Sequence, residues 1–442
     1  MEYPFWFIPW LSKGLIIGVI SVLHVFVAQF AVGGGIYLAW MERKAHAQGS
    51  PELLEWLERH TRFFLLLTMV FGGISGVAIW FSITVASPAA TSLLVHNFVF
   101  IWAAEWTFFL LEIVSLLIYY YTYARCRRGE FSARLHMKIG WVYAFAGFMS
   151  LFLINGIITF MLTPGDSLET RSLGDAFFNP TFWPSLVFRT ALCLMLAGMF
   201  ALFTAARIPS AAVKRAVVRS AGLWIVLPLL VLLASSAWYY FALPPDRQAA
   251  MARHTADMYP FVRAYAWVLP LIFLAGVFAF IRAERLRRPM SVVILCTGLV
   301  LVGAFEWMRE TGRRPWVVPG YMYSNGMRIA EGEQIRRQGI ASVSGWAGLL
   351  ADQKASDGAR VSSGALIFEQ QCGSCHGIHG PKLDIVPLLE RYSPAGIKAQ
   401  VAGQGRRLTY MPPFFGSQDD LETIARYLNS IRAQRPNQSA LP

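Results

Sequence analysis

A cysteine pair followed by a histidine stands near the C-terminus, in the stretch FEQQCGSCHGIHG (residues 368–380). Cys372 and Cys375 flank two residues, and His376 follows directly. This spacing predicts covalent attachment of a c-type haem through two thioether bonds, with His376 as the proximal iron ligand. A redox or zinc motif is the alternative, which the adjacent histidine and the sequence downstream disfavour.

A methionine downstream offers the second axial ligand of such a haem. Met411 lies in RRLTYMPPFFGS, between GALIFEQQCGSCHG and SQDDLETIARYLNSIR, which both predict helices. A His/Met ligand pair raises the reduction potential of a haem. We therefore expect His376 and Met411 to hold the iron, and His379 to be a surface residue.

Ionisable side chains also lie within long apolar segments, where they are costly and usually functional. They are His24 in VLHVFVAQF, Glu105 and Glu112 in AAEWTFFLLE, and Glu306 and Glu310 in FEWMRETGRRPW. Neutral histidine and carboxylate groups are both workable ligands of haem iron. The alternatives are a hydrogen-bonded core histidine at position 24, and ion pairs of Glu310 with Arg309 or Arg313.

The other histidines and a glycine run have more ordinary interpretations. Four histidines are expected in loops: His46, His60, His136 and His254. His96 is expected at a membrane interface, with replacement of a missing haem ligand as the alternative. The run AVGGGIY, which contains Gly33–Gly35, predicts a helix-packing surface rather than a binding loop.

The elements that position these residues are membrane spans. Apolar residues make up 55% of the 442, too many for an ordinary soluble protein. Crossing a bilayer takes about 20 residues, and the segments of sufficient length are 14–40, 62–86, 97–123, 139–162, 186–206, 219–242, 260–281 and 290–308. The stretch GSPELLEWLERHTR predicts a short surface helix before the second span, with a serine cap and a proline at its first position.

Basic residues predict the orientation of the spans. The formal net charge is +13, and basic residues gather in the loops after the first, third, fifth and seventh segments. Because such loops stay in the cytoplasm, the N-terminus and everything after residue 308 are expected on the outer side. Covalent haem is attached on that side, which agrees with an even number of spans. We expect a multi-pass protein of the bacterial inner membrane.

The composition turns polar at about residue 325. The expected fold class is all-α: a polytopic bundle of about eight spans, followed by a small α-helical cytochrome c domain. The predicted domains are a transmembrane haem domain over 1–324, a linker over 325–361 and a mono-haem cytochrome c domain over 362–442.

Residues 1 to about 325 resemble subunit I of the cytochrome bd-type oxidases. That family has a histidine in its first span, a glutamate in its third and an E-x-G-R-Q-P-W signature at the outer end of a late span. Here these are His24, Glu105 and the stretch ETGRRPW, Glu310–Trp316. The resemblance implies that His24 and Glu310 serve a high-spin haem b. Glu105 would ligate or neighbour the haem that binds oxygen, either haem d or a further haem b.

The resemblance assigns roles to further residues. Glu112 matches a second carboxylate of the third span, which delivers protons in the family, although the spacing here is one residue shorter. Arg313 and Trp316 of the signature would belong to the cofactor site. Glu105, Glu112 and Glu310 are therefore the expected catalytic residues.

The sequence also departs from the family. The low-spin haem b of the family takes a histidine near the outer end of the fifth span, but in this chain NPTFWPSLVFRTALCL has Arg189 near that place. The methionine of a later span is absent from YPFVRAYAWVLPL. The long quinol-oxidising loop is reduced to ALPPDRQAAMARHTADMYP, the ninth span is missing, and Arg314 replaces the glutamine of the signature.

These departures favour electron input through haem c rather than from quinol. We expect an oxygen reductase subunit that accepts electrons from a soluble or membrane c-type cytochrome. It would work beside a second multi-span subunit of the bd subunit II type, with further cytochrome subunits as an additional class of partner. Two alternatives stay open: an electron-transfer subunit of a larger respiratory complex without oxygen chemistry, or a reductase of another small acceptor such as nitric oxide.

Overall fold

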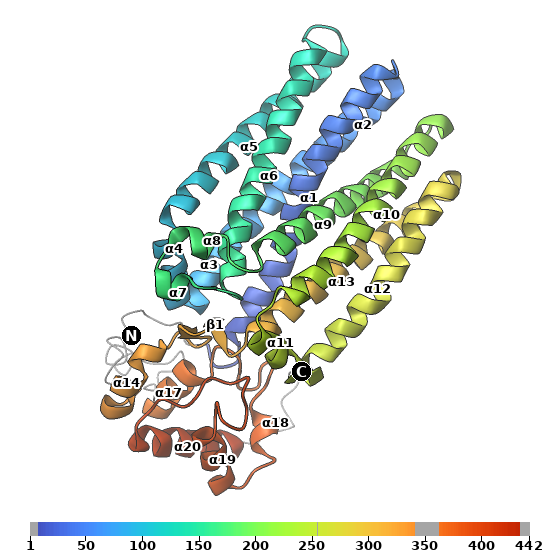
Figure 1. Cartoon of the computed structure of the whole chain (residues 1–442). Coiled ribbons are helices and arrows are strands. Elements are labelled where there is room, and N and C mark those ends of the chain that lie inside the picture. The colour runs from blue at the N-terminus through green and yellow to red at the C-terminus, as the bar shows by residue number, and fades with distance from the viewer. Residues whose placement is uncertain (1–7, 254, 341–361, 434–442) are drawn as a thin grey trace. The chain divides into compact units, whose positions relative to one another are not determined.

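The structure, a computed structural model, describes residues 8–253, 255–340 and 362–433 (Figure 1). Its contacts divide the chain into two compact units. The bundle unit comprises residues 21–78 and 95–312, and the terminal unit comprises residues up to 20, residues 79–94 and the chain from Arg313 onward. His254, most of the predicted linker (341–361) and the last nine residues of the predicted cytochrome domain (434–442) lie outside the described residues.

Eight helical stretches among the described residues are long and apolar enough to cross a membrane, as predicted. They are α1 (Lys13–Ala47), Pro51–Ala86, α5 (Val99–Arg127), α6 (Ala133–Phe160), α9 (Phe182–Ala205), α10 (Ala211–Phe241), α12 (Thr255–Ile281) and α13 (Arg288–Arg313). The predicted all-α class with about eight spans is confirmed.

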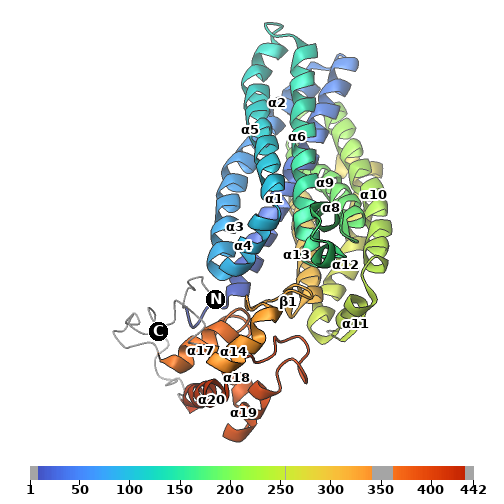
Figure 2. The same ribbon diagram turned by 60° about the vertical axis from the view of Figure 1, so that its left-hand side comes forward.

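Helix α9 is the most buried span of the bundle unit. It packs against α10 and α6, while α5 pairs with α6 and α12 with α10, as both views show (Figures 1 and 2). Almost every side of α9 is covered, from Phe182 to Ala205. An apolar helix that is buried all round belongs in the core of its unit.

The glycine run of α1 lets three other helices approach its backbone. A Cβ atom on Gly33 would lie 1.9 Å from the carbonyl oxygen of Cys193 in α9. On Gly35 it would lie 2.1 Å from the ring of Tyr143 in α6, and on Gly34 it would lie 2.5 Å from the ring of Phe64. The predicted helix-packing surface is confirmed.

The second span differs from its prediction. α2 (Pro51–Leu65), a π-helical turn (Leu66–Gly72) and α3 (Gly73–Ala86) form one continuous helical stretch instead of a surface helix and a separate span. The expected cap is present, since Ser50 Oγ accepts from the Leu53 amide (3.4 Å). The helix is not on the surface, however, because Trp56 and Leu57 are buried in the apolar core of the bundle unit.

Three of the histidines predicted in loops lie in helices. His46 belongs to α1, His60 to α2 and His136 to α6. His60 and His136 are buried: His60 Nδ1 lies 2.8 Å from Thr204 Oγ1, and His136 is paired with Glu42. The loop prediction was wrong for His46 and His136 because their helices extend several residues beyond the apolar parts, whereas His60 lies in the helix predicted from GSPELLEWLERHTR.

Short helices connect the spans. They are α4 (Pro88–Asn97), α7 (Ser167–Thr170), α8 (Leu173–Phe177), α11 (Pro245–Arg253) and the 3-10 turn Ala283–Arg285. α11 lies within the segment that was expected as a shortened outer loop.

The C-terminal part of the terminal unit is a small helical domain with a two-stranded antiparallel sheet. Its elements are β1 (Trp316–Val318), β2 (Met322–Tyr323), the 3-10 turn Ile329–Glu331, α14 (Gly332–Gln338), α17 (Ser363–Gln371), α18 (Val386–Leu389), α19 (Pro394–Ala402) and α20 (Gln418–Ala433). Residues 325–340, predicted as part of a linker, contribute Met327 and Ile335 to the same apolar core as Ile424. The domain boundaries at 324 and 361 stay a prediction.

Candidate haem sites

The Cys372–His376 motif forms the turn that ends α17. The amide of Cys372 donates to the Phe368 carbonyl (2.7 Å), and the amide of His376 donates to the Cys372 carbonyl (2.9 Å). Cys372 is buried, and Cys375 and His376 are half-buried. The turn thus holds two thiols and an imidazole within five residues, as two thioether bonds and a proximal ligand to one haem require.

The tautomer of His376 is fixed by its surroundings. Nδ1 lies 3.0 Å from the Leu383 carbonyl oxygen. A carbonyl can only accept, so Nδ1 carries the proton and Nε2 keeps the lone pair that an iron ligand needs. Burial lowers the pKa of His376, with the Leu383 bond opposing this effect and Arg314 adding to it. The imidazole is therefore neutral at neutral pH.

The loop that contains Met411 is hydrogen-bonded to the end of α17. Met411 is half-buried in the loop between α19 and α20. Gln371, the buried residue before the first motif cysteine, donates from Nε2 to the Pro413 carbonyl (3.0 Å) and to Gln404 Oε1 (3.2 Å). The residues present therefore fit a covalent haem c with His376 and Met411 as its ligands. Sequence reasoning did not identify Gln371, which carries no motif.

The first described residues of the chain lie against this motif within the terminal unit. The Ile378 amide donates to the Pro9 carbonyl (2.7 Å), and the Gly14 amide donates to the Ser374 carbonyl (3.0 Å). Lys13 Nζ forms an ion pair with the buried Glu369 Oε1 (2.7 Å). Burial raises the pKa of Glu369, and Lys13 partly offsets this rise. The motif is thus anchored by the start of α1.

His24 is positioned by the second span. Its Nδ1 lies 3.1 Å from Ser75 Oγ, whose hydroxyl donates to the Gly72 carbonyl (3.1 Å). Because the serine proton is used, His24 Nδ1–H donates to Ser75 and Nε2 keeps its lone pair. Gly72 ends the π-helical turn, and such turns are frequent at functional sites. His24 therefore fits the role of a haem ligand.

The two glutamates of α5 lie seven residues apart, and both are half-buried. Glu112 Oε1 accepts a hydrogen bond from the Tyr143 hydroxyl of α6 (3.0 Å). The same hydroxyl faces the Ala31 carbonyl of α1 (3.1 Å). Glu112 thus lies between three helices, whereas Glu105 lies two turns nearer the start of α5.

Glu310 is half-buried near the end of α13. Helix α13 passes close to α1 beside His24, because a Cβ on Gly303 would lie 3.5 Å from Val22. From the signature, Arg313 Nη1 donates to the Val317 carbonyl (3.1 Å), and the Trp316 ring stacks on Tyr323 (4.0 Å between centroids). These two side chains stabilise the turn that follows α13, and their role at a cofactor stays a prediction.

A buried charge cluster was missed by sequence reasoning. Arg189 Nη2 of α9 lies 2.9 Å from Glu306 Oε1, and Arg309 Nε lies 3.0 Å from Glu306 Oε2. Arg189 and Glu306 are 2% and 6% exposed, so the cluster belongs to the core. The signal for it was an arginine within an apolar segment, which needs a carboxylate partner.

The position of Arg189 does not fit a haem ligand. An arginine keeps its protons in proteins and offers no lone pair to iron. Its guanidinium is already paired with Glu306 and lies over the Phe305 ring at 5.7 Å. We therefore derive no low-spin haem at this place.

Two further histidines are peripheral. His379 is exposed, and its amide donates to Asp384 Oδ1 (2.9 Å) in a turn where its φ is 53°. This confirms the surface position predicted for it. His96 is exposed near the end of α4.

Comparison with known proteins gives two family matches. The family model for cytochrome bd terminal oxidase subunit I matches residues 15–267, which is more than half of the chain. The model for cytochrome C oxidase, cbb3-type, subunit III matches residues 359–428, which include the Cys372–His376 motif and Met411. A search of curated proteins found no match.

Among the solved structures that are similar in fold is that of bd oxidase from Geobacillus thermodenitrificans. The TM-score is 0.61 at 15% identity, and the match covers 72% of this chain and 90% of that chain. At this identity the likeness shows the shared fold alone.

Proposed function

The chain belongs to the cytochrome bd terminal oxidase subunit I family, and from this premise we propose that it is part of an oxygen reductase fed by a c-type cytochrome. The reaction is O2 + 4 e⁻ + 4 H⁺ → 2 H2O, with the electrons arriving singly from reduced cytochrome c. The eight candidate spans support a multi-pass protein, which in this proposal belongs to the bacterial inner membrane. The basic loops face the cytoplasm, and the N-terminus and cytochrome c domain face outward.

One observation carries the proposal. The chain has a fused domain whose His376 is neutral and correctly protonated for a haem c, while the place of the family's low-spin haem ligand holds Arg189 in a buried ion pair. The chain has gained a domain that can accept electrons from cytochrome c. It has also lost a ligand of the haem that accepts electrons from quinol. Electron input from cytochrome c accounts for both changes together.

The residues of the membrane domain would bind the haems and deliver protons. Bound haem, of the b or d type, supplies redox-active iron and the place where oxygen binds. His24 offers Nε2, and Glu310 and Glu105 offer carboxylates, to hold such groups. Glu112 passes protons toward Glu105. A second multi-span subunit is expected to complete the complex.

The donor is tested with the purified complex. We expect oxygen consumption with reduced cytochrome c and none with a quinol, and carbon monoxide should change the spectrum of the reduced complex because an oxygen site must be open. Robust quinol oxidation that is lost on mutating this chain would contradict the proposal. A reduced spectrum insensitive to carbon monoxide would instead indicate an electron-transfer subunit without oxygen chemistry.

A further inference from the structure

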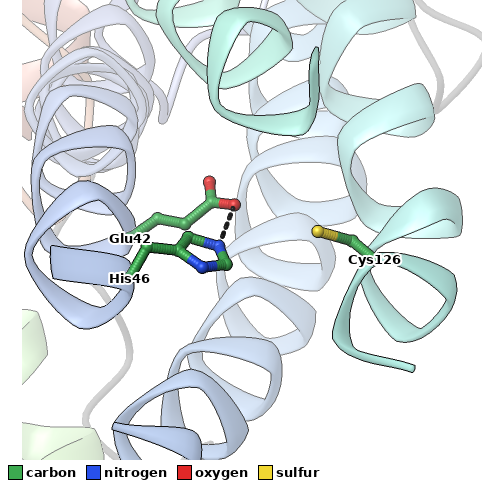
Figure 3. Close-up of side chains that lie close together, drawn as sticks. All are labelled: Glu42, His46 and Cys126. Atoms are coloured by element: carbon green, nitrogen blue, oxygen red, sulfur yellow. Dashed lines mark ion pairs between the residues drawn. The ribbon is translucent and has the colours of Figure 1, made fainter. Parts of the chain in front are cut away.

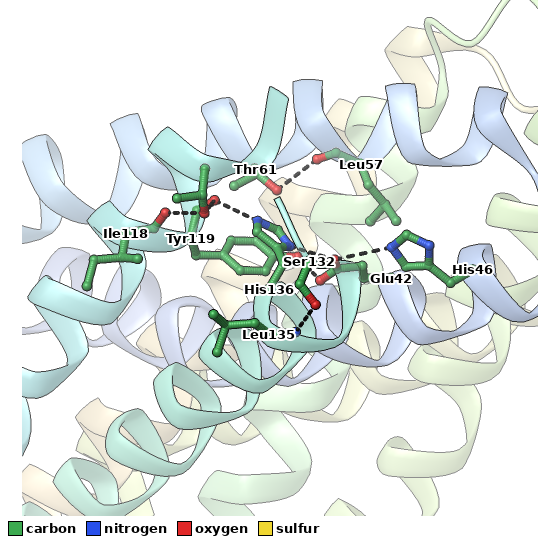
Figure 4. A network of polar contacts seen from close by, with 10 residues as sticks. Glu42, His46, Leu57, Thr61, Ile118, Tyr119, Ser132, Leu135 and His136 are labelled. Atoms are coloured by element: carbon green, nitrogen blue, oxygen red, sulfur yellow. Dashed lines mark hydrogen bonds and ion pairs between the residues drawn. The ribbon is translucent and has the colours of Figure 1, made fainter. Parts of the chain in front are cut away.

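Within the bundle unit, 18 residues along α1 from His24, helices α1, α5 and α6 enclose a polar cluster at the end that carries basic loops (Figure 4). His136 Nδ1 lies 2.6 Å from Glu42 Oε1, and the Tyr119 hydroxyl donates to Glu42 Oε2 (2.8 Å). Glu42 and His136 are 1% and 0% exposed. Ionisable groups buried in a protein core are costly unless they are paired and hydrogen-bonded, as these are.

The hydrogen bonds place one mobile proton in this pair. His136 Nε2 lies 2.9 Å from the Tyr119 carbonyl oxygen, which only accepts, so Nε2 is protonated. A single further proton then lies between Nδ1 and Glu42 Oε1. It belongs to an imidazolium beside a carboxylate or to an imidazole beside a carboxylic acid, and the pair can release and regain it.

A path from solvent reaches this pair through His46. Its Nε2 lies 3.6 Å from Glu42 Oε1 and has no hydrogen-bond partner, and its side chain is 25% exposed. Figure 3 shows the His46 ring turned toward Glu42, with Cys126 on a neighbouring helix. A small rotation of the ring would bring the two atoms within hydrogen-bond distance. His46 is thus the side chain through which protons can be exchanged with water.

A polar stripe on α5 leads from this pair toward the candidate oxygen site. Tyr119, Ser115, Glu112 and Glu105 are spaced by four, three and seven residues, so they lie on one face of the helix. Tyr119 and Glu112 are separated by about 10 Å along the axis, with the buried Ser115 hydroxyl between them. Proton transfer over this interval requires bridging water molecules.

Helix α6 closes the other side of the stripe. His136 and Tyr143 are seven residues apart on it, and Tyr143 donates to Glu112 as Tyr119 donates to Glu42. Gly140 lies between them, where a Cβ would come 3.0 Å from the Tyr119 ring. Glu42 and Glu112 therefore each accept a hydrogen bond from a tyrosine hydroxyl.

We propose that His46 and the Glu42–His136 pair form the proton-uptake end of a path that runs along α5 to Glu112. This inference rests on the proposed oxygen reduction, which consumes four protons for each O2. Each proton moves from water to His46, then to the Glu42–His136 pair, which releases its own proton toward Glu112. Tyr119 stabilises the Glu42 carboxylate while it is unprotonated.

The test uses the complete purified complex with Glu42→Gln. We expect turnover with reduced cytochrome c and oxygen to fall by about a hundredfold, the lower end of what a positioned proton-transfer group contributes. Anaerobic reduction of the haems by cytochrome c should keep its rate, because electron input does not use this pair. Glu42→Asp should recover part of the lost turnover.

A matched control lies at the same end of the bundle unit. Glu58 of α2 pairs with Arg127 (3.1 Å) and is 28% exposed, and Glu58→Gln should leave turnover unchanged. Infrared difference spectra of reduction give a readout that does not depend on turnover. A carboxyl band should be present in the wild type and in Glu58→Gln but missing from Glu42→Gln.

The outcomes separate this inference from the proposed function. A wild-type complex that does not reduce oxygen contradicts the function, whereas a Glu42→Gln complex with wild-type turnover overturns the uptake path. If Glu42→Gln does not assemble, His46→Gln and Tyr119→Phe carry the test, and wild-type turnover in both overturns it. Glu42, His46 and Cys126 have ligand atoms within 4.8 Å of one another. A stoichiometric metal ion that is lost in Cys126→Ser would also overturn the proton role.

Discussion

At the scale of single residues, this protein uses fixed hydrogen bonds to set the state of its histidines. The Leu383 carbonyl fixes the tautomer of His376, Ser75 fixes that of His24, and the Tyr119 carbonyl fixes that of His136. The first two keep Nε2 available for a ligand bond. The third leaves a shared proton instead, so the same side chain serves two kinds of chemistry.

The Glu306 cluster yields a prediction about stability. Glu306→Gln removes the carboxylate charge that Arg189 and Arg309 share in the core, and breaking such a buried pair costs about 3–5 kcal/mol. We expect a clear drop in the thermal unfolding temperature of the purified complex. Glu55→Gln, which breaks an exposed pair with Arg59 (3.6 Å), should cost less than about 1 kcal/mol. Equal effects of the two changes would show that the cluster is solvated.

At the scale of elements, the bundle unit depends on how closely α1 approaches α9. Gly33 permits that approach because its hydrogen occupies the place where a Cβ would overlap the Cys193 carbonyl. The neighbouring glycines do the same for the rings of Phe64 and Tyr143. One short run of the sequence therefore sets the spacing of α1 from three elements.

A pair of glycine substitutions tests this dependence. Gly33→Ala should push α1 from α9 and greatly reduce the yield of assembled complex, since backbone atoms cannot move aside as a side chain can. Gly73→Ala has open space around it and should be neutral or stabilising by up to about 1 kcal/mol. Size-exclusion chromatography and haem content of both variants give the comparison. Normal assembly of Gly33→Ala would contradict the packing argument.

At the scale of the whole molecule, the eight candidate spans among the described residues predict that the segments before the first span and after the last lie on one side of the membrane. From the positive-inside rule we expect this to be the outer side. The loop between α5 and α6, which contains the exposed Glu130, should then face the cytoplasm. The exposed Glu169 in α7 should face outward.

Cysteine labelling in intact cells tests the orientation. In a background without Cys126, Cys193 and Cys296, a membrane-impermeant thiol reagent should modify Glu169→Cys from outside. It should modify Glu130→Cys only after the cells are opened. The reverse pattern would place the cytochrome c domain in the cytoplasm, where covalent haem attachment would not be expected.

Much of this protein is determined by local sequence. Apolar length alone predicts eight spans, since crossing a bilayer needs a helix of fixed minimum length. The spacing of Cys372, Cys375 and His376 predicts their chemistry, because one helical turn brings them together. The glycine run predicts a packing surface because residues without side chains let neighbouring helices come close.

Only the tertiary structure decides which distant side chains meet. Glu42, Tyr119 and His136 come from three helices, and neither the partner of Arg189 nor the partner of His24 is marked by any spacing in the sequence. His46 and His136 were expected in loops because the apolar part of each helix is shorter than the helix itself, whereas backbone hydrogen bonds continue through polar residues. Burial of those residues depends on neighbouring helices, so the sequence determines the spans and the haem motif, and the packing of helices determines the polar networks.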